Sequence, residues 1–199
     1  RAERAARTLL KSGADGLMSV GVAGGLAPDL ACGDVVVARS VLDGDAAPGA
    51  GERVKCVRRA LLPSNLEDVG VRPWLGDVAT CRRVVLTPGD KEKLFHTTRA
   101  LAVDMESLAV GRVADESGML FLAARSVADT ASDEIPKELL AGLSPDGRLK
   151  PLGVALAMLK KPGLAKAAFH LARQSRRALK SLGLAAPELA WHAKMLLAG

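Results

Sequence analysis

Short apolar runs bounded by glycine or polar residues alternate with helical hydrophobic periods along the first two thirds of the chain. Apolar runs rich in valine favour buried strands, whereas apolar residues three and four positions apart favour helices. The strands predicted in this way are residues 16–22, 34–38, 83–86, 100–103 and 119–127. The predicted helices are a segment around residues 5–10, a helix with Thr87 as N-cap and Pro88 at N1, and residues 107–116, ended by Gly118.

From Pro136 onward the pattern consists of helical periods alone. Breaks at residues 144–147 and 161–163 divide this part into three or four predicted helices with no strand. Residues 43–52 have the composition of a loop, and residues 63–76 show no clear period. We therefore predict an α/β fold, in which helices cover the faces of a sheet, followed by an all-helical C-terminal extension.

Composition narrows the class of protein. Hydrophobic residues make up 49% of the 199 residues and charged residues 25%, and no apolar run approaches the roughly 20 residues that a membrane span needs. Aromatic residues are only 3%, which disfavours RNA-binding modules that stack bases. Cys32, Cys56 and Cys81 are widely spaced without a CxxC pair, which indicates buried thiols in a reducing compartment rather than disulfides or a zinc site.

The net charge of +6 is concentrated at the C-terminus. Residues 150–199 carry nine Lys and Arg against one Glu, a net charge of +8, so the rest of the chain is slightly acidic. Residues 158–182 are predicted to form a helix with Leu164, Leu171 and Leu179 near one face. A solvated basic face is one interpretation of this helix, and association with an anionic membrane surface is the other.

Three segments that could carry chemistry lie at the ends of predicted strands: GVAGG at 21–25, VDMES at 103–107 and RSVAD at 125–129. The glycines would let the backbone approach a ligand closely, although their spacing matches neither a dinucleotide-binding fingerprint nor a P-loop. Taken singly, the segments could be a tight turn, acidic caps at a helix start and a solvated loop aspartate.

Taken together, these segments resemble the nucleoside phosphorylase and nucleosidase family of the purine nucleoside phosphorylase and methylthioadenosine nucleosidase type, over about residues 5–135. The segments TPGDK at 87–91, 100–107, and 135–136 with 142–148 look most like the hopanoid-associated phosphorylase branch. The resemblance implies a mixed central sheet flanked by helices in a domain at 1–135, with the helical extension at 136–199 packed on or beside it. The family's first strand, with the carboxylate that activates water, would precede Arg1, so we expect that the natural start is missing.

The resemblance also implies cleavage of the N-glycosidic bond of an adenine nucleoside, by phosphorolysis or hydrolysis, with the catalytic roles on Glu106 and Asp129. Glu106 would accept hydrogen bonds from the ribose hydroxyls, and Asp129 would protonate N7 of the base. A protonated Asp129 needs burial or a nearby negative charge, which Asp104 could supply while Arg125 opposes it. Besides the catalytic Glu106 and Asp129, the resemblance implies that these residues bind the substrate: Val103, Asp104, Met105, Gly21, Ala23, Gly24 and Arg125.

The chain departs from the family pattern at several positions. Val22 and Ala128 stand where hydroxyl residues are frequent, so phosphate is an optional co-substrate. Lys91, Glu92 and Lys93 replace the aromatic residue that stacks on the base, with Phe95 as the nearest substitute. No other cofactor and no metal is expected. His170 and His192 are interpreted as ordinary helix-face residues.

The predicted substrate is a small purine nucleoside linked to a lipid, of the adenosylhopane type, and no nucleic acid is expected to bind. The chain is predicted to be a homo-oligomer, a dimer, that is cytoplasmic and peripheral at the inner membrane through residues 158–182. One alternative is a soluble methylthioadenosine or adenosylhomocysteine nucleosidase. An alternative of another class is a basic nucleic-acid-binding or adaptor protein without catalysis.

Overall fold

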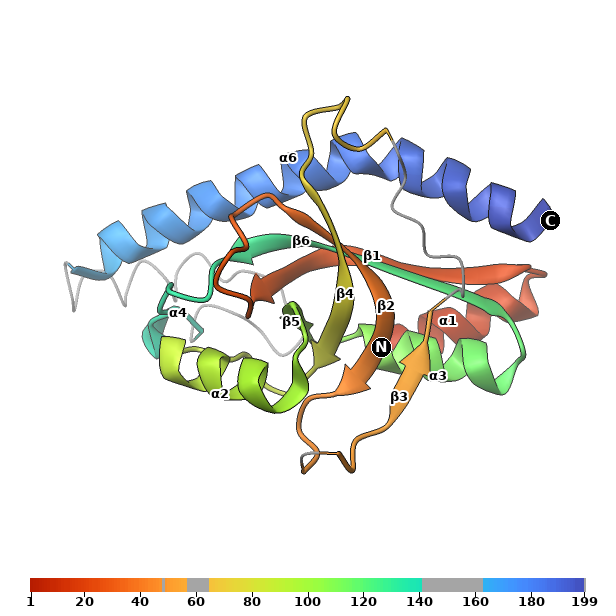
Figure 1. Ribbon diagram of the computed structural model, residues 1–199, viewed down its shortest axis with the longest axis horizontal. Helices are drawn as coiled ribbons and strands as arrows, with labels where there is room; N and C mark the ends of the chain where they lie inside the picture. Colours follow the sequence, from red (N-terminus) through yellow and green to blue (C-terminus); the bar gives the residue numbers. More distant parts are fainter. Residues whose placement is uncertain (48, 57–64, 141–162, 199) are drawn as a thin grey trace.

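The computed structural model describes residues 1–47, 49–56, 65–140 and 163–198. Its elements, in chain order, are α1 (Ala2–Lys11), β1 (Gly16–Gly25), β2 (Val35–Asp43), β3 (Arg53–Lys55), β4 (Pro73–Thr80), α2 (Pro88–Thr98), β5 (Ala102–Asp104), α3 (Ser107–Glu116), β6 (Leu120–Asp129), α4 (Lys137–Leu140) and α6 (Gly163–Ala198). Figure 1 shows the strands at the centre, with helices on both sides of them.

The six strands form one mixed sheet in the order β3-β2-β4-β5-β1-β6. β1 runs parallel to β6, and β4 runs parallel to both β2 and β5, whereas β1 with β5 and β2 with β3 are antiparallel. β2 also pairs with β6 over Val35–Val37, so the sheet curls back on itself. The predicted mixed α/β architecture is confirmed.

Alternate side chains of β6 enter two separate apolar cores. Phe121 and Ala123 pack with residues of α1 and α3 on one face of the sheet. Leu122 and Ala124 pack on the other face with Ala185 and Leu189 of α6. The period of two along the strand therefore explains why helices cover both faces, and Figure 1 shows α6 lying across one of them. Because α6 shares this core, the C-terminal helix packs directly on the sheet.

Several sequence predictions are confirmed by the elements around α2 and α3. Thr87 caps α2, since its hydroxyl accepts a hydrogen bond from the Asp90 amide, and Pro88 opens the helix. α3 has the predicted bounds, and Gly118 follows it with a φ of 64°, a left-handed conformation that glycine adopts without strain.

Two predictions for the middle of the sheet are wrong. Residues 83–86 are not a strand, because the chain leaves the sheet after the Cys81 amide bonds the Asp104 carbonyl. Residues 73–80 form β4 between β2 and β5. No strand was predicted there, and the first part of β4 lies in the segment that shows no clear period in the sequence. Proline, glycine and aspartate interrupt the apolar pattern of β4, which obscures its strand character in the sequence.

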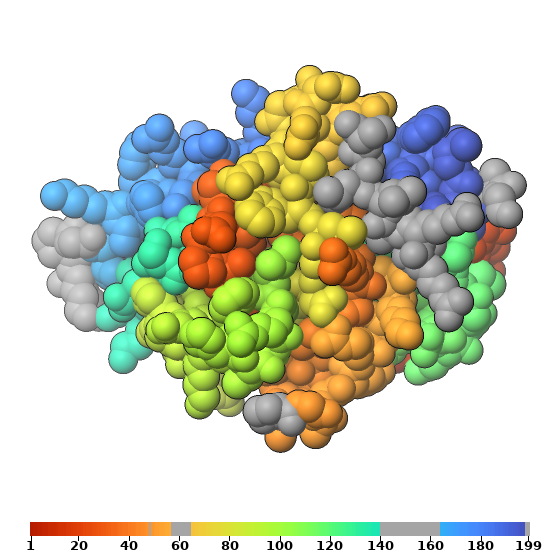
Figure 2. Space-filling view, viewed as in Figure 1, coloured from red at the N-terminus to blue at the C-terminus, as the bar shows by residue number. Residues whose placement is uncertain are grey.

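Within the described part of the C-terminal region, residues 136–140 and 163–198, there are helices and no strand. The predicted break at 144–147 and the start of the helix at 158 lie outside the described residues. α6 continues without interruption to Ala198, beyond its predicted end at 182 and through Pro187. The leucines of the predicted apolar face differ in exposure: Leu164 is buried, whereas Leu179 is 58% exposed, among exposed basic residues. Figure 2 shows this helix along one rim of the molecule. No described helix is long and apolar enough to cross a membrane.

Gly111 of α3 lies where the helix packs closely on the sheet, and it gives a test of the fold. A Cβ at Gly111 would lie 2.9 Å from Cε1 of Phe121 and 3.2 Å from both Val41 and Val54. Gly111→Ala should therefore lower the free energy of unfolding by about 1–3 kcal/mol, as overpacking does. The matched control Gly183→Ala, in a helix with open space around the site, should raise it by about 0.5–1 kcal/mol. Urea unfolding followed by circular dichroism measures both, and an unchanged Gly111→Ala would contradict the close packing of α3.

Candidate active site

A cleft of about 260 Å³ lies where β1 and β6 end and β5 gives way to α3. All three segments singled out in the sequence contribute to its lining, together with Arg83, Val84 and Val85 from the segment after β4. Of the predicted site residues, those that line it are Ala23, Gly24, Val103, Asp104, Met105, Glu106 and Asp129. Gly21 and Arg125 do not line it, and their contact with substrate stays a prediction.

Gly24 brings two of these segments together. β1 and β6 pair in parallel, and after a register shift Gly24 lies opposite Asp129. A Cβ on Gly24 would lie 3.1 Å from Oδ2 of Asp129 and 3.3 Å from Val103. A larger residue would displace the carboxylate, so the glycine at this position allows Asp129 to lie beside the cleft.

Asp104 and Arg125 form an ion pair beneath the cleft, with their side chains 1% and 3% exposed. The Arg125 guanidinium donates to Oδ2 of Asp104 at 2.7 Å and to the Ser19 hydroxyl at 2.6 Å. Asp104 also accepts hydrogen bonds from the Thr80 hydroxyl and from the Ser107 amide at the start of α3. This pair therefore joins β1, β4, β6 and α3, and fixes the position of the segment that carries Glu106.

Glu106 and Met105 lie at the mouth of the cleft and are exposed. Glu106 is the N-cap residue of α3, but its side chain makes no capping hydrogen bond; the Ser107 amide donates to Asp104 and the Leu108 amide donates to the Thr80 hydroxyl. Among the described residues the Glu106 carboxylate has no ion-pair partner. The interpretation of Glu106 as a capping group is therefore wrong, and its carboxylate can interact with a ligand in the cleft.

Asp129 lies between the cleft and Lys91 of α2. The Lys91 ammonium donates to Oδ2 of Asp129 at 2.6 Å and to the backbone carbonyls of Thr130 and Asp133 at 2.7 and 2.9 Å. Burial raises the pKa of Asp129 above its ordinary value, Lys91 opposes this by charge and hydrogen bond, and Asp133 raises it further. The cation and anion that act on Asp129 are thus Lys91 and Asp133, not Arg125 and Asp104 as expected from the sequence.

The loop after β6 is tied to α6 through Asp133. The Asp133 carboxylate accepts hydrogen bonds from the Thr130 amide and hydroxyl and from the Gln174 amide, and lies 3.2 Å from the His170 ring. Burial alone would raise the pKa of Asp133, but these hydrogen bonds outweigh burial and hold the pKa well below its ordinary value. His170, interpreted as an ordinary helix-face residue, therefore helps to hold the loop that supplies two acceptors to Lys91.

The sequence did not predict a site role for Lys91, which was noted there as one of the residues that replace the stacking aromatic of the family. Its helical spacing contains a signal, because Lys91, Leu94 and Thr98 lie three and four positions apart on one face of α2. Lys91 and Leu94 of this face are buried. A lysine in register with a buried leucine at a helix start needs an internal partner, which the sequence alone does not identify.

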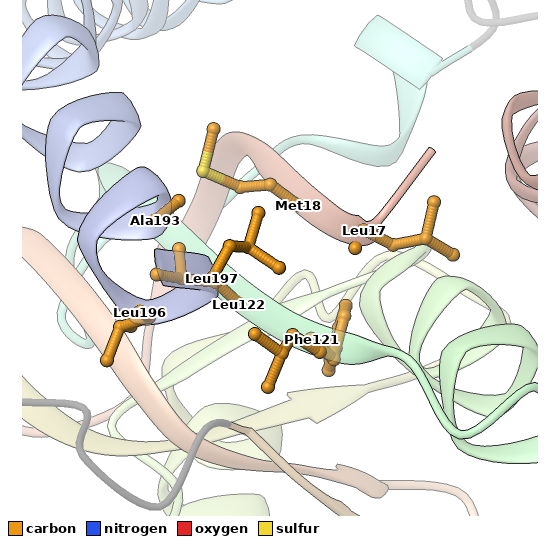
Figure 3. Close-up of a pocket in the computed structure, with 9 residues that line it drawn as sticks. Leu17, Met18, Phe121, Leu122, Ala193, Leu196 and Leu197 are labelled. Carbon is orange, nitrogen blue, oxygen red and sulfur yellow. The ribbon is translucent and has the colours of Figure 1, made fainter. Parts of the chain in front are cut away.

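A second pocket, of about 80 Å³, lies at the opposite ends of β1 and β6, against the end of α6 (Figure 3). Its lining is apolar and includes Met18, Phe121 and Leu197, so it offers no group for acid–base chemistry. Cys56 and Cys81 are buried free thiols whose pKa values burial raises to about 12. Across the described ranges no cluster of His, Cys, Asp and Glu could hold a metal ion.

The curled mixed sheet, with glycines in the last part of β1 and with Glu106 and Asp129 at the ends of β5 and β6, is an α/β fold of the nucleoside phosphorylase type; residues 21–25 are strand, so their interpretation as a tight turn is wrong. The sequence model of the phosphorylase superfamily matches residues 1–145. The chain belongs to the phosphorylase superfamily.

Solved structures share this fold at low sequence identity. The 5'-methylthioadenosine/S-adenosylhomocysteine nucleosidase of Campylobacter jejuni superposes with a TM-score of 0.58 and 23% identity, covering 67% of this chain and 64% of that one. For a futalosine hydrolase of Helicobacter pylori the values are 0.57 and 23%, covering 66% and 65%. A Helicobacter pylori nucleosidase with 5'-methylthioadenosine in its active site gives 0.59 and 22%, covering 83% and 75%. The chain thus spans slightly less than two thirds of the length of the first two.

The depressed pKa of Asp133 predicts an acid-sensitive loop. The ionised Asp133 carboxylate stabilises the folded state fully above the unfolded-state pKa of about 3.9. This stabilisation is lost as the pH falls towards the lower folded-state pKa. Asp133→Asn should therefore lower the free energy of unfolding at pH 7 by about 1–3 kcal/mol, and should make it fall less steeply between about pH 5 and pH 2. Urea unfolding at a series of pH values measures this. The exposed control Asp68→Asn should follow the wild type, and an unchanged slope in Asp133→Asn would contradict the prediction.

Proposed function

We propose that this protein cleaves the N-glycosidic bond of a purine nucleoside, with adenine as the leaving base. The observation that carries the proposal is the joint placement of Glu106 and Asp129 in one cleft, in a chain of the phosphorylase superfamily. The names of the nucleosidases and of the hydrolase that share the fold support the same reaction class. A non-catalytic adaptor or nucleic-acid-binding role would not require two carboxylates to meet at this cleft.

The chemistry of the bond explains why two carboxylates are needed. As C1' and N9 separate, positive charge develops on the ribose and negative charge on the purine. Glu106, which is not used in capping α3, would bind the ribose hydroxyls and stabilise the cationic sugar. A unit charge about 4 Å from this cation contributes roughly 4 kcal/mol at an effective dielectric constant of 20, equivalent to about three decades in rate.

Asp129 would supply the proton to N7 of the leaving purine. Burial raises its pKa, as a general acid that works near neutral pH requires. The Asp129 side chain is 12% exposed and lines the cleft, so it is accessible to a ligand there while remaining largely dry. The electron pair of the broken bond stays on the purine, and the proton from Asp129 neutralises it.

The residues at the mouth of the cleft indicate the chemical character of the 5' substituent of the nucleoside. Val22, Val84 and Met105 are apolar lining residues that are 37–47% exposed, which suits an apolar substituent. A thioether such as that of methylthioadenosine fits this chemistry, and it is the substituent that the names of the related nucleosidases favour. An adenosylhopane-type lipid would also meet the apolar mouth, with the basic residues of α6 and exposed Phe169 offering a membrane contact.

Phosphorolysis and hydrolysis differ in the need for an anion site. Arg83 is the one cationic side chain among the described residues that line the cleft, and it would be the group available to phosphate. Release of adenine that depends on added phosphate would assign phosphorolysis, and release without phosphate would assign hydrolysis. A homo-oligomeric state is also part of the proposal, and gel filtration with light scattering measures it.

Adenine release from 5'-methylthioadenosine, and from an adenosine linked at C5' to a hydrophobic chain in vesicles, tests the function. Glu106→Gln should lower kcat by about two to three decades, because the neutral amide loses the interaction with the cationic sugar. Glu67→Gln is the matched control, an exposed residue outside the cleft, and it should retain activity. If the wild type releases no base from either substrate, or if Glu106→Gln keeps normal turnover, the proposed role is wrong.

Asp129→Asn should lower kcat by about two to four decades with the same substrates, because an amide cannot protonate N7. The loss should be smallest for a nucleoside whose base leaves readily without protonation. Comparing kcat for adenine and for such an activated base measures the effect, with the exposed Asp68→Asn as control. Equal losses on both substrates would mean that Asp129 only binds the base.

A further inference from the structure

Lys91 is a completely buried lysine, with 0% of its side chain exposed. Its three hydrogen-bond partners are Oδ2 of Asp129 and the carbonyls of Thr130 and Asp133, all within 2.9 Å. An ammonium group has three N–H donors, and each has an acceptor here, so the environment matches the charged form of lysine. Burial of a charge is unfavourable unless it is paired and hydrogen-bonded, and these contacts meet that condition.

The position of Lys91 relative to the cleft restricts what it can do. Asp129 lines the cleft and Lys91 does not, so the lysine lies behind the carboxylate and out of reach of a substrate. Lys91 binds Oδ2 of Asp129, and no described residue forms a hydrogen bond with Oδ1. The lysine thereby fixes the carboxyl group through one oxygen and leaves the other for a ligand.

We propose that Lys91 is a positioning residue that controls the protonation of Asp129, an inference that rests on the proposed function. When the C1'–N9 bond breaks, its electron pair stays on the purine and the Asp129 proton passes to N7. Asp129 then becomes a carboxylate, and the Lys91 ammonium stabilises that anion without giving up a proton. Before transfer the same charge favours loss of the proton, so Lys91 makes Asp129 a stronger acid while lowering its protonated fraction.

Other charged groups around Asp129 do not replace Lys91 in this role. Asp133, in the loop after β6, acts in the opposite direction to Lys91. Asp104 of β5 is paired with Arg125 of β6 beneath the cleft. Glu106 of α3 and Arg83 after β4 line the cleft, and neither forms a described ion pair with Asp129. The Cys32 thiol, before β2, has its pKa raised chiefly by burial; Arg177 lowers this pKa, and Asp133 and Asp129 raise it.

The first test is the pH dependence of kcat/KM for 5'-methylthioadenosine. Lys91→Met removes the charge and keeps the length of the side chain, so Asp129 should hold its proton to higher pH. The alkaline limb should move up by about one to three pH units. The plateau value should fall roughly 10- to 100-fold, because the product carboxylate has lost its cation. Lys93→Met, the same substitution at an exposed position of α2, should leave both the limb and the plateau unchanged.

A second measurement needs no activity. In protein labelled with ¹³C at the aspartate carboxyl carbons, Asp129→Asn assigns the Asp129 resonance, and its titration is compared between wild type and Lys91→Met. The midpoint should rise in the variant by the same amount as the alkaline limb. Lys91→Gln, which is neutral but can still donate to the Thr130 carbonyl, serves as a second variant if Lys91→Met does not fold, as judged by circular dichroism.

The two readouts separate the inference from the proposed function. A raised Asp129 midpoint in a protein that releases no adenine would support the role of Lys91 and overturn the function. Adenine release with an unchanged midpoint and an unchanged alkaline limb would overturn the role of Lys91, which would then be purely structural. A lower plateau without a shift of the limb would likewise overturn control of protonation.

Discussion

β1 and β6 pair in parallel from Gly16 and Leu120 as far as Ala23 and Val127, and then their register shifts so that Gly24 faces Asp129. The geometry of the cleft depends on this close approach of backbone to carboxylate. A side chain at Gly24 would occupy the space between Asp129 and Val103. The approach holds the acid beside the segment that carries Glu106, and it turns the opposite side of Asp129 towards α2.

Two buried ion pairs then stabilise the site, and they differ in their relation to the ligand. Arg125 and Asp104 interact within the sheet and with the start of α3, where every charged group already has a protein partner. In the pair of Lys91 and Asp129, Oδ1 of Asp129 has no hydrogen-bond partner among the described residues, whereas both carboxylate oxygens of Asp104 are bonded. The first pair provides rigidity, and the second places a charge where a proton must move.

The sequence predicts those parts of the fold that local patterns determine. Thr87 and Pro88 specify the start of α2, and Gly118 specifies the end of α3, because capping and left-handed backbone depend on single residues. The sequence did not predict β4, because its strand character comes from pairing with β2 and β5, which are distant in sequence. Residues 83–86 have strand-like composition, but the sheet offers them no partner.

In the candidate site, too, the sequence predicts what local motifs determine and not what depends on residues distant in the chain. The motifs indicate Glu106 and Asp129 as candidate site residues, and both line one cleft in the structure. The partner of Asp129 could not be predicted, because the expected cation, Arg125, is four residues away in the same strand, whereas the observed one, Lys91, comes from helix α2. Likewise, the contact of His170 with Asp133 joins residues 37 positions apart and has no local pattern.

α6 contacts the rest of the molecule along its length, and two of these contacts lie on either side of its middle. Near its start Gln174 binds Asp133, and further along Leu189 packs in the apolar core against the sheet. The two contacts are 15 residues apart, which corresponds to roughly 22 Å of helix. Gln174 thus connects the helix that covers one face of the sheet to the loop whose carbonyls bind the Lys91 ammonium, so part of the support of the buried acid comes from the C-terminal helix.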